Sequence, residues 1–130
     1  MPMITLKVAA EENEEIAFEL ARTITQLTAK VLRKDPHVTA VAIEFIPAQR
    51  WFTGERSALQ RGVASFFLET RITAGTNNSE EKARYVTSAH AAIASILGGA
   101  HEESYVHVHE VSADGYGYGG QTQAQRHGTR

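Results

Sequence analysis

The chain has 130 residues, a formal net charge of -2 and no cysteine. Its length is that of one domain. The near-neutral charge excludes an electrostatic nucleic-acid binder, and the lack of cysteine excludes a disulfide scaffold, a thiolate metal site and a cysteine nucleophile. No apolar run approaches the roughly 18 residues of a membrane span, and the start Met1-Pro2-Met3-Ile4 lacks the pattern of a signal peptide. We therefore expect one cytoplasmic domain over residues 1–130 that binds neither nucleic acid nor membrane.

The first half of the sequence predicts a strand, a helix and a second strand. Apolar and polar residues alternate over residues 3–8, as in a half-buried strand. Asn13 is a candidate N-cap, and the helix that follows has one apolar stripe of Ile16, Leu20, Ile24, Leu27 and Val31. Asp35-Pro36 is expected to end this helix, because proline disfavours helical geometry in the residue before it. A second strand is expected over residues 38–45, and residues 47–54 are interpreted as a loop.

The second half repeats this order. Residues 65–73 are interpreted as a strand, and Asn78-Ser79 as the cap of a helix that ends at Gly98-Gly99. The expected apolar stripe of that helix is Val86, His90, Ile93 and Leu97, with His90 interpreted as a buried, hydrogen-bonded histidine. Residues 105–111 alternate as a strand, and the glycine-rich residues 114–120 are interpreted as a hairpin.

Landmarks of the two halves recur at a nearly constant spacing. Val8 matches Ile72 at an offset of 64, and three further matches share an offset of 66: Glu14-Glu15-x-Ala17 with Glu80-Glu81-x-Ala83, Glu44 with Glu110, and Gly54 with Gly120. We infer two duplicated β-α-β units, residues 2–54 and 65–120, with a linker over 55–64 and a polar tail over 121–130 that packs loosely or on a neighbouring chain. Such units predict an α+β fold with a four-stranded sheet and two helices on one face. The uncovered face of that sheet predicts an oligomer.

Pro2 is the residue with the most distinctive chemistry. Removal of the initiator Met1 is favoured when the next residue is small, and it leaves a free secondary amine on Pro2. An α-amino group titrates near ~7.7–8.0, and burial or nearby cations lower that pKa because both disfavour the charged form. A neutral amine of this kind is a suitable general base at physiological pH.

A proline at the start of the first strand of a duplicated β-α-β chain resembles the tautomerase superfamily, whose members use an amino-terminal proline as catalytic base or acid. Pro2-Met3-Ile4-Thr5-Leu6 and Lys34-Asp35-Pro36 resemble segments of macrophage migration inhibitory factor. Ile72-Thr73-Ala74-Gly75 is similar to an element of 5-carboxymethyl-2-hydroxymuconate isomerase. The run Gly115-Tyr116-Gly117-Tyr118-Gly119-Gly120 is similar to the end of the short 4-oxalocrotonate tautomerase unit.

The resemblance implies a homotrimer that needs no cofactor and has one site at each Pro2, because Phe66 stands where a second proline would superpose. It implies substrate-binding roles for Tyr105, His107 and Lys34, and Arg71 is a candidate partner for a substrate carboxylate. The alternatives are interface packing for Tyr105 and His107, a favourable helix C-terminal charge for Lys34, and an exposed edge cation for Arg71. His107-x-His109 offers two metal ligands without an identifiable third, so no metal is expected.

We therefore expect an enol–keto tautomerase in which Pro2 moves a proton on a small enol or 2-hydroxydienoate that bears a carboxylate. The arginines that hold a dicarboxylate in short 4-oxalocrotonate tautomerases are missing here, which disfavours 2-hydroxymuconate as a substrate. One alternative is a hydratase, dehalogenase or decarboxylase with a protonated proline. Another is a non-catalytic oligomeric binding protein that retains the fold.

Overall fold

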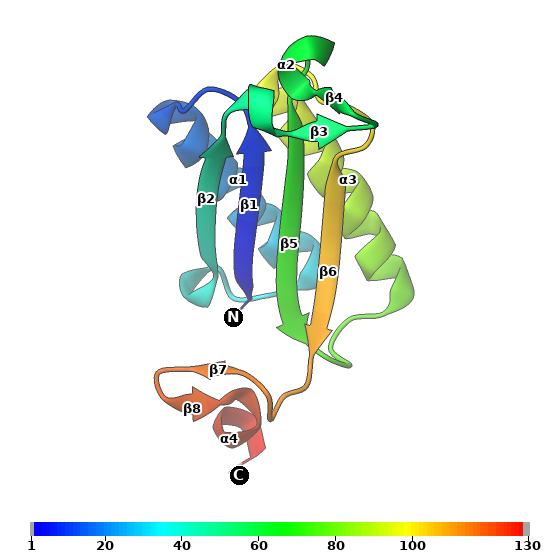
Figure 1. Cartoon of the computed structure of the whole chain (residues 1–130). Coiled ribbons are helices and arrows are strands. Elements are labelled where there is room, and N and C mark those ends of the chain that lie inside the picture. The colour runs from blue at the N-terminus through cyan, green and yellow to red at the C-terminus, as the bar shows by residue number, and fades with distance from the viewer. Residues whose placement is uncertain (1, 129–130) are drawn as a thin grey trace.

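The computed structural model describes residues 2–128 (Figure 1). The first half contains β1 (Met3–Ala9), α1 (Glu14–Leu32) and β2 (Ala40–Ile46), and the second half contains β5 (Ser65–Thr73), α3 (Ser79–Leu97) and β6 (Tyr105–Val111). Each half ends in a small hairpin and a short helix. These are β3 (Phe52–Thr53), β4 (Arg56–Ser57) and α2 (Ala58–Arg61) in the first half, and β7 (Gly117–Tyr118), β8 (Gln121–Thr122) and α4 (Gln123–Gly128) in the second.

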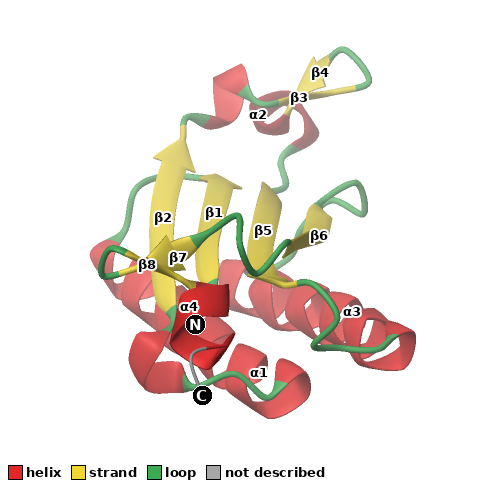
Figure 2. Cartoon of the chain, turned by 90° about the horizontal axis from the view of Figure 1, so that it is seen from below, coloured by secondary structure: helices red, strands yellow, loops and turns green. Residues whose placement is uncertain are grey.

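The four long strands form one sheet in the order β2-β1-β5-β6. The outer strands run parallel to their neighbours, whereas the central pair β1–β5 is antiparallel. Both long helices cover the same face of the sheet and pack against each other, as Figure 2 shows. The predicted α+β fold is therefore confirmed, and because the central pair is antiparallel, equivalent ends of the two units point in opposite directions.

The core lies between the sheet and the two long helices. Alternate residues of the central strands are buried, as the two-residue period of a strand requires: Ile4, Leu6, Val8, Phe66, Leu68 and Ile72. The Tyr85 hydroxyl of α3 is hydrogen bonded to Thr28 Oγ1 and to Thr70 Oγ1, at 2.9 Å in each case. Burial raises the pKa of Tyr85, so this hydroxyl keeps its proton and joins both helices to the sheet.

The structure corrects the helix alignment of the repeat by one position. The N-caps Asn13 and Asn78 stand at an offset of 65, and each accepts a hydrogen bond from a backbone N–H three positions later. The buried stripe of α3 is therefore Tyr85, Ala89 and Ile93, one position before the predicted Val86 and His90. The Glu-Glu match misleads because acidic residues suit any position of a first helical turn. His90 is half-buried and packs on the Phe66 ring at 5.1 Å between centroids.

The second strand of the first unit also differs from the prediction. It begins at Ala40 rather than at residue 38, because Pro36–Val38 forms a 3-10 turn capped by the Asp35 side chain. Outward-facing residues of β2 have even numbers and those of β6 have odd numbers, so Glu44 and Glu110 lie on opposite faces and are not equivalent. Glu110 instead lies on the helix side of the sheet, where Lys82 Nζ is 3.1 Å from its carboxylate.

Two segments that the sequence predicts as a linker and a polar tail belong to equivalent hairpin–helix modules. We define the first module as residues 51–62 and the second as residues 116–127. Every element of one begins at an offset of 65 from its counterpart in the other. Arg61 donates to the Thr53 carbonyl at 2.7 Å, and Arg126 donates to the Tyr118 carbonyl at 2.9 Å. The modules lie at opposite ends of the sheet (Figure 1), and the remaining tail residues 129–130 lie outside the described part.

Candidate active site

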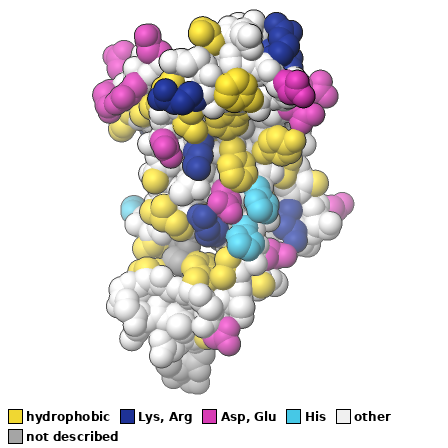
Figure 3. Space-filling model, in the orientation of Figure 1, with side chains coloured by type: hydrophobic (Ala, Val, Ile, Leu, Met, Phe, Trp, Pro, Cys, Tyr) yellow, Lys and Arg dark blue, Asp and Glu magenta, His cyan; other side chains and the backbone are white. Residues whose placement is uncertain are grey.

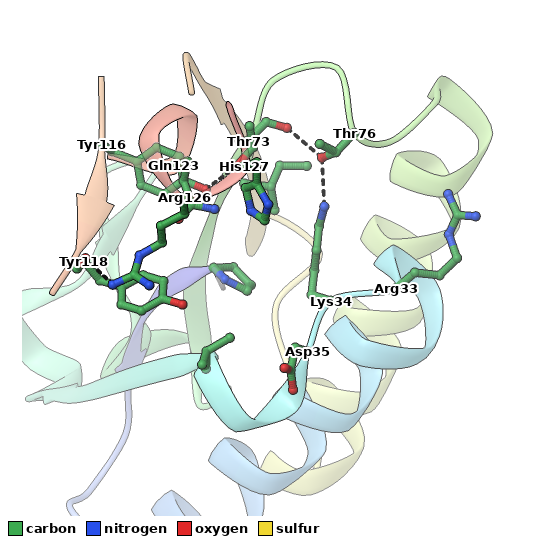
Figure 4. Close-up of a pocket in the computed structure, with 13 residues that line it drawn as sticks. Arg33, Lys34, Asp35, Thr73, Thr76, Tyr116, Tyr118, Gln123, Arg126 and His127 are labelled. Atoms are coloured by element: carbon green, nitrogen blue, oxygen red, sulfur yellow. Dashed lines mark hydrogen bonds between the residues drawn. The ribbon is translucent and has the colours of Figure 1, made fainter. Parts of the chain in front are cut away.

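A cavity of about 460 Å³ lies where the start of β1, the end of α1, the end of β5 and the second module meet (Figure 4). Its lining includes Pro2 from the sheet, Lys34 from the end of α1, and Tyr118 and Arg126 from the second module. Residues from both ends of the sequence thus meet in it, so the cavity exists only in the folded protein.

Pro2 is buried in the wall of this cavity. Its carbonyl accepts a hydrogen bond from the backbone N–H of Ala40 at 3.1 Å, which extends the β1–β2 pairing to the first described residue. Met1, whose removal the sequence predicts, lies outside the described residues.

Lys34 reaches the cavity because α1 ends just before it in a left-handed turn. Arg33 has φ 58° and serves as the C-cap of the helix. The Lys34 ammonium donates a 2.8 Å hydrogen bond to Thr76 Oγ1, which itself donates to the Thr73 carbonyl at 2.7 Å. Burial, assisted by the neighbouring Arg33 charge and opposed by Glu81, lowers the pKa of Lys34.

The turn that carries Lys34 is tied to the start of α3. Arg33 Nη2 lies 2.7 Å from Glu81 Oε2, and Asn77 Nδ2 donates to the Leu32 carbonyl at 3.0 Å. Hydrogen bonds from the Asn78 backbone and then from the Asn77 side chain, with Arg33 adding a smaller attraction, hold the pKa of Glu81 below its usual value. The end of one helix is thus fixed on the capping box of the other.

The second module supplies the opposite wall of the cavity. The Tyr116 hydroxyl is 2.7 Å from Thr73 Oγ1, which joins the module to the end of β5. The Arg126 guanidinium lies 3.8 Å from the centre of the Tyr118 ring, a cation–π contact, and also donates to the Tyr118 carbonyl. Figure 4 shows Tyr118 and Arg126 on one side of the cavity and Lys34 on the other.

The cavity has a cationic lining. Arg33, Lys34 and Arg126 line it together with the carboxylate of Asp35. The Asp35 carboxylate also accepts a hydrogen bond from the His37 backbone N–H at 2.9 Å. Burial and neighbouring cations disfavour the charged form of an amine, and the same cations attract an anion. Such a cavity can keep an amine neutral and hold a carboxylate.

The other predicted site residues lie on the uncovered sheet face. Arg71 Nη2 is paired with Glu69 Oε1 at 2.8 Å. His107 and His109 Nδ1 are 3.9 and 3.8 Å from Glu69 Oε2, and the two imidazoles stack at 5.7 Å. Figure 3 shows histidines beside acidic and basic side chains on this face. Within residues 2–128, no group of three or more His, Asp or Glu side chains is arranged to hold a metal ion.

Tyr105 lies farther along the same face, near the first module. Its side chain is 59% exposed, and its hydroxyl donates to Glu103 Oε2 at 2.7 Å. This contact with Glu103 raises the pKa of Tyr105. Tyr105 borders a second hollow with Trp51 and Phe52, at the other end of the sheet from Pro2. Within one chain, the structure therefore brings Lys34 to Pro2 but does not bring Tyr105, His107 or Arg71 there.

Sequence reasoning missed the contribution of the second module. Tyr116, Tyr118, Gln123 and Arg126 all line the cavity, and the last two fall in the predicted polar tail. One usable signal was present, because Gln60-Arg61 recurs as Gln125-Arg126 at the corrected offset of 65. No described helix has both the length and the apolar character to cross a membrane.

No protein-family model and no curated protein matches this sequence, whereas solved structures match it over nearly its whole length. Native fused 4-OT matches with a TM-score of 0.84 and 21% identity, covering 97% of this chain and 98% of that chain. A wild-type fused 4-OT asymmetric trimer matches with a TM-score of 0.84 and 16% identity, covering 96% and 98%. A protein inactivated by 2-oxo-3-pentynoate matches with a TM-score of 0.84 and 10% identity, covering 96% and 98%. The chain therefore has the tautomerase-superfamily fold in its form with two fused units.

Proposed function

We propose that this chain is an enol–keto tautomerase in which the Pro2 amine is the general base. The observation that carries the proposal is the burial of Pro2 in a cavity whose lining includes the cations of Lys34 and Arg126. Both features lower the pKa of an amine towards the range in which the neutral base is populated. The proposal requires removal of Met1, because a Pro2 nitrogen within a peptide bond is an amide and not a base.

The proposed reaction moves one proton and needs no cofactor. The neutral Pro2 nitrogen takes the proton from the enol hydroxyl, which breaks the O–H bond and leaves an enolate. The electron pair of the C=C bond then takes that proton from the prolinium to form a C–H bond, which completes the ketone C=O bond and regenerates the neutral amine. In the reverse direction the amine takes a proton from the carbon next to the carbonyl.

Lys34 is the proposed partner of a substrate carboxylate. Its ammonium has three donors, of which the structure shows one used on Thr76. The partial burial that lowers the pKa of Lys34 also strengthens its attraction to an anion, because less water screens the pair. Arg71 is the weaker candidate, since its guanidinium is paired with Glu69 outside the cavity.

We further propose a homotrimer in which the uncovered sheet face meets a neighbouring chain. Two observations support it: Met3 and Tyr105 are 37% and 59% exposed on that face, and a fused 4-OT of the same fold is a trimer. In such an assembly Tyr105 and His107 would serve the cavity of a neighbour, which would give them the substrate-binding role that the resemblance implies.

Turnover of phenylenolpyruvate to phenylpyruvate tests the central proposal. We expect Pro2→Ala to lower kcat/KM by roughly 10²–10⁴-fold, the usual contribution of a general base. The matched control is Pro47→Ala, which changes an exposed proline that precedes the Ala48–Arg50 turn and should leave kcat/KM unchanged. Wild-type turnover in Pro2→Ala would overturn the proposal.

Covalent labelling separates the chemistry of Pro2 from that of other groups. We expect 2-oxo-3-pentynoate to add to the N-terminal peptide of chains that lack Met1, and not to chains that retain it. The pKa of the Pro2 amine, measured by nitrogen NMR, then decides between two mechanisms. A value near or below neutrality supports the base, whereas a value well above neutrality favours a hydratase, dehalogenase or decarboxylase with a protonated proline.

A further inference from the structure

Gln123 has a polar group that the fold leaves unused. It is the first residue of α4, it is 5% exposed, and it lines the Pro2 cavity. Its carboxamide oxygen is buried and has no hydrogen-bond partner among the described residues. Buried polar atoms in folded proteins are nearly always paired, because an unpaired one destabilises the fold. The partner of such an oxygen beside a cavity therefore comes from outside the described residues, as water or as a ligand.

The first module shows that the fold does not need a carboxamide at this position. Ala58 is the equivalent residue and is 3% exposed. Its backbone N–H donates to the Trp51 carbonyl at 2.8 Å, and the Gln123 N–H donates to the Tyr116 carbonyl at 2.9 Å. A methyl group is therefore sufficient to build the module. The carboxamide is present only in the module that borders Pro2.

Other polar side chains of the second module have internal partners. Gln125 Oε1 accepts from the Thr122 N–H at 2.8 Å, and the Gln125 N–H donates back to Thr122 Oγ1 at 3.0 Å, which forms a capping box. Tyr116 is bonded to Thr73, and Arg126 donates to the Tyr118 carbonyl. These contacts use the terminal polar groups of the three side chains, although Arg126 Nε is also buried without a partner among the described residues. Arg61 Nε of the first module is unpaired in the same way, so that feature belongs to the shared scaffold, whereas the Gln123 carboxamide has no counterpart in the first module.

We propose that the Gln123 carboxamide binds the substrate oxygen that the reaction converts between an enol hydroxyl and a ketone. This inference rests on the proposed function and names the substrate feature that the site recognises. The carboxamide oxygen can accept from the enol hydroxyl as the substrate binds, before Pro2 takes that proton, and the carboxamide NH2 can donate to the ketone oxygen that forms, without any change in the charge of Gln123. Gln123 is then a specificity-determining residue for carboxylates with an oxygen on the adjacent carbon, while Lys34 holds the carboxylate.

The variant Gln123→Met tests this role, because it keeps a side chain of similar size and removes both polar atoms. The two probes are phenylenolpyruvate and cinnamate, which has the same phenyl and carboxylate groups but no oxygen on the carbon next to the carboxylate. We expect kcat/KM for phenylenolpyruvate to fall about 10- to 100-fold, the usual effect of losing such a contact. The inhibition constant of cinnamate should stay within about twofold of the wild-type value.

Thermal unfolding adds a readout that separates binding from structure. Because Gln123→Met removes an unpaired buried atom, its melting temperature should equal or exceed that of the wild type. The matched control Gln125→Met removes the side-chain acceptor of the capping box, which receives the Thr122 N–H, so it should lower the melting temperature while changing neither the turnover of phenylenolpyruvate nor the affinity for cinnamate by more than about twofold. Gln123→Ala, which introduces the residue of the first module, should change phenylenolpyruvate turnover and cinnamate inhibition in the same way as Gln123→Met. It shows whether a poor fit of the methionine side chain causes the loss of turnover.

Two outcomes would overturn the inference: unchanged phenylenolpyruvate turnover in both Gln123 variants, or an equal loss of turnover and of cinnamate affinity. Either result together with an inactive Pro2→Ala would leave the proposed base in place. If Pro2→Ala remains active, the base is wrong, and the preference for phenylenolpyruvate over cinnamate in the Gln123 variants still decides the role of the carboxamide.

Discussion

The two hairpin–helix modules share a scaffold and differ in what they present to the adjoining end of the sheet. Arg61 and Arg126 make the same contact with a hairpin carbonyl, and the helices of both modules begin with a capping box. The cavity-facing positions differ, since Tyr118 and Gln123 stand where the first module has a threonine and an alanine. Duplication has thus provided the scaffold twice, and the side chains that border Pro2 occur once.

The same contrast holds where the two units begin. Phe66 stands at the position equivalent to Pro2, is fully buried and packs against His90 at 5.1 Å. The position equivalent to Lys34 is Gly99, which has no charge to offer. At the end where the first unit has a cationic cavity, the second unit has apolar packing instead. A residue type that occurs at equivalent positions of both units is explained by the fold. A residue type that occurs only at the end of the sheet that contains Pro2 needs another explanation.

Among the variants that compare the two modules, the largest effect is expected from Gly117→Ala in the second module. A Cβ on this residue would overlap the backbone oxygen of Gln121, so the hairpin must move to accept Gly117→Ala. Such overpacking costs about 1–3 kcal/mol. Displacing this wall of the cavity should lower kcat/KM for phenylenolpyruvate by roughly 100-fold. The equivalent residue of the first module is Phe52, whose side chain is 64% exposed, and Phe52→Ala should leave turnover within about twofold.

Turnover assays and thermal unfolding of both variants check this contrast. Equal losses of activity would mean that both modules support the site, as they would if a neighbouring chain placed its first module there. Unchanged activity in Gly117→Ala would mean that the second module is not a wall of the working site.

The sequence was sufficient for the long elements but not for the modules. The strands and helices are recognisable because each buries an apolar face, which imposes a period of two or 3.6 residues. The module strands have two residues each, so they show no period, and their stability comes from backbone contacts and a capping box. Pro2 was predicted from the chemistry of its amine and then from the resemblance, whereas Lys34 was predicted through the resemblance alone. Gln123 could not be, because its role depends on a neighbour that lies at the other end of the sequence.

Lys34 offers a second test of the difference between the two units, with a smaller expected effect, because the equivalent residue of the second unit is Gly99. We expect Lys34→Met to raise KM for phenylenolpyruvate about 10- to 100-fold, with a smaller change in kcat, since a hydrogen bond to a charged group contributes about 1.5–3 kcal/mol. Because burial and Arg33 lower the pKa of Lys34, the wild-type KM should begin to rise at a pH below that of an ordinary lysine. Lys34→Arg stays charged and should keep KM flat over that range.

Loss of stability caused by deprotonation of Lys34 cannot explain that rise in KM with pH. The unfolded lysine keeps its proton to a higher pH than the folded one, so its contribution to the free energy of unfolding increases as the pH rises through the lowered pKa. A KM that rises in the same way in the wild type and in Lys34→Arg would contradict the proposed role.

The smallest expected difference is in the free energy of unfolding of two variants, Arg61→Ala and Arg126→Ala. Of these two arginines, only Arg126 lines the cavity. Arg61 and Arg126 each donate to a hairpin carbonyl, and each has a buried Nε without a partner among the described residues. Arg61→Ala should therefore lower the free energy of unfolding by about 0.5–1.5 kcal/mol. Arg126→Ala should cost about 0.5–1 kcal/mol more, because it also loses the cation–π contact with Tyr118.

Denaturant unfolding measures the difference in the free energy of unfolding. Phenylenolpyruvate turnover, measured at a temperature where both variants are folded, shows whether Arg126 also contributes to catalysis. If Arg126 stabilises the module and does not bind the substrate, kcat/KM in Arg126→Ala should fall only a few-fold, because one positive charge near Pro2 is lost. A rise of 100-fold or more in KM, with a stability change equal to that of Arg61→Ala, would instead assign the Arg126 guanidinium to the substrate carboxylate. In that case Lys34 would not be its main partner, and the shared scaffold would itself have been adapted at the Pro2 end.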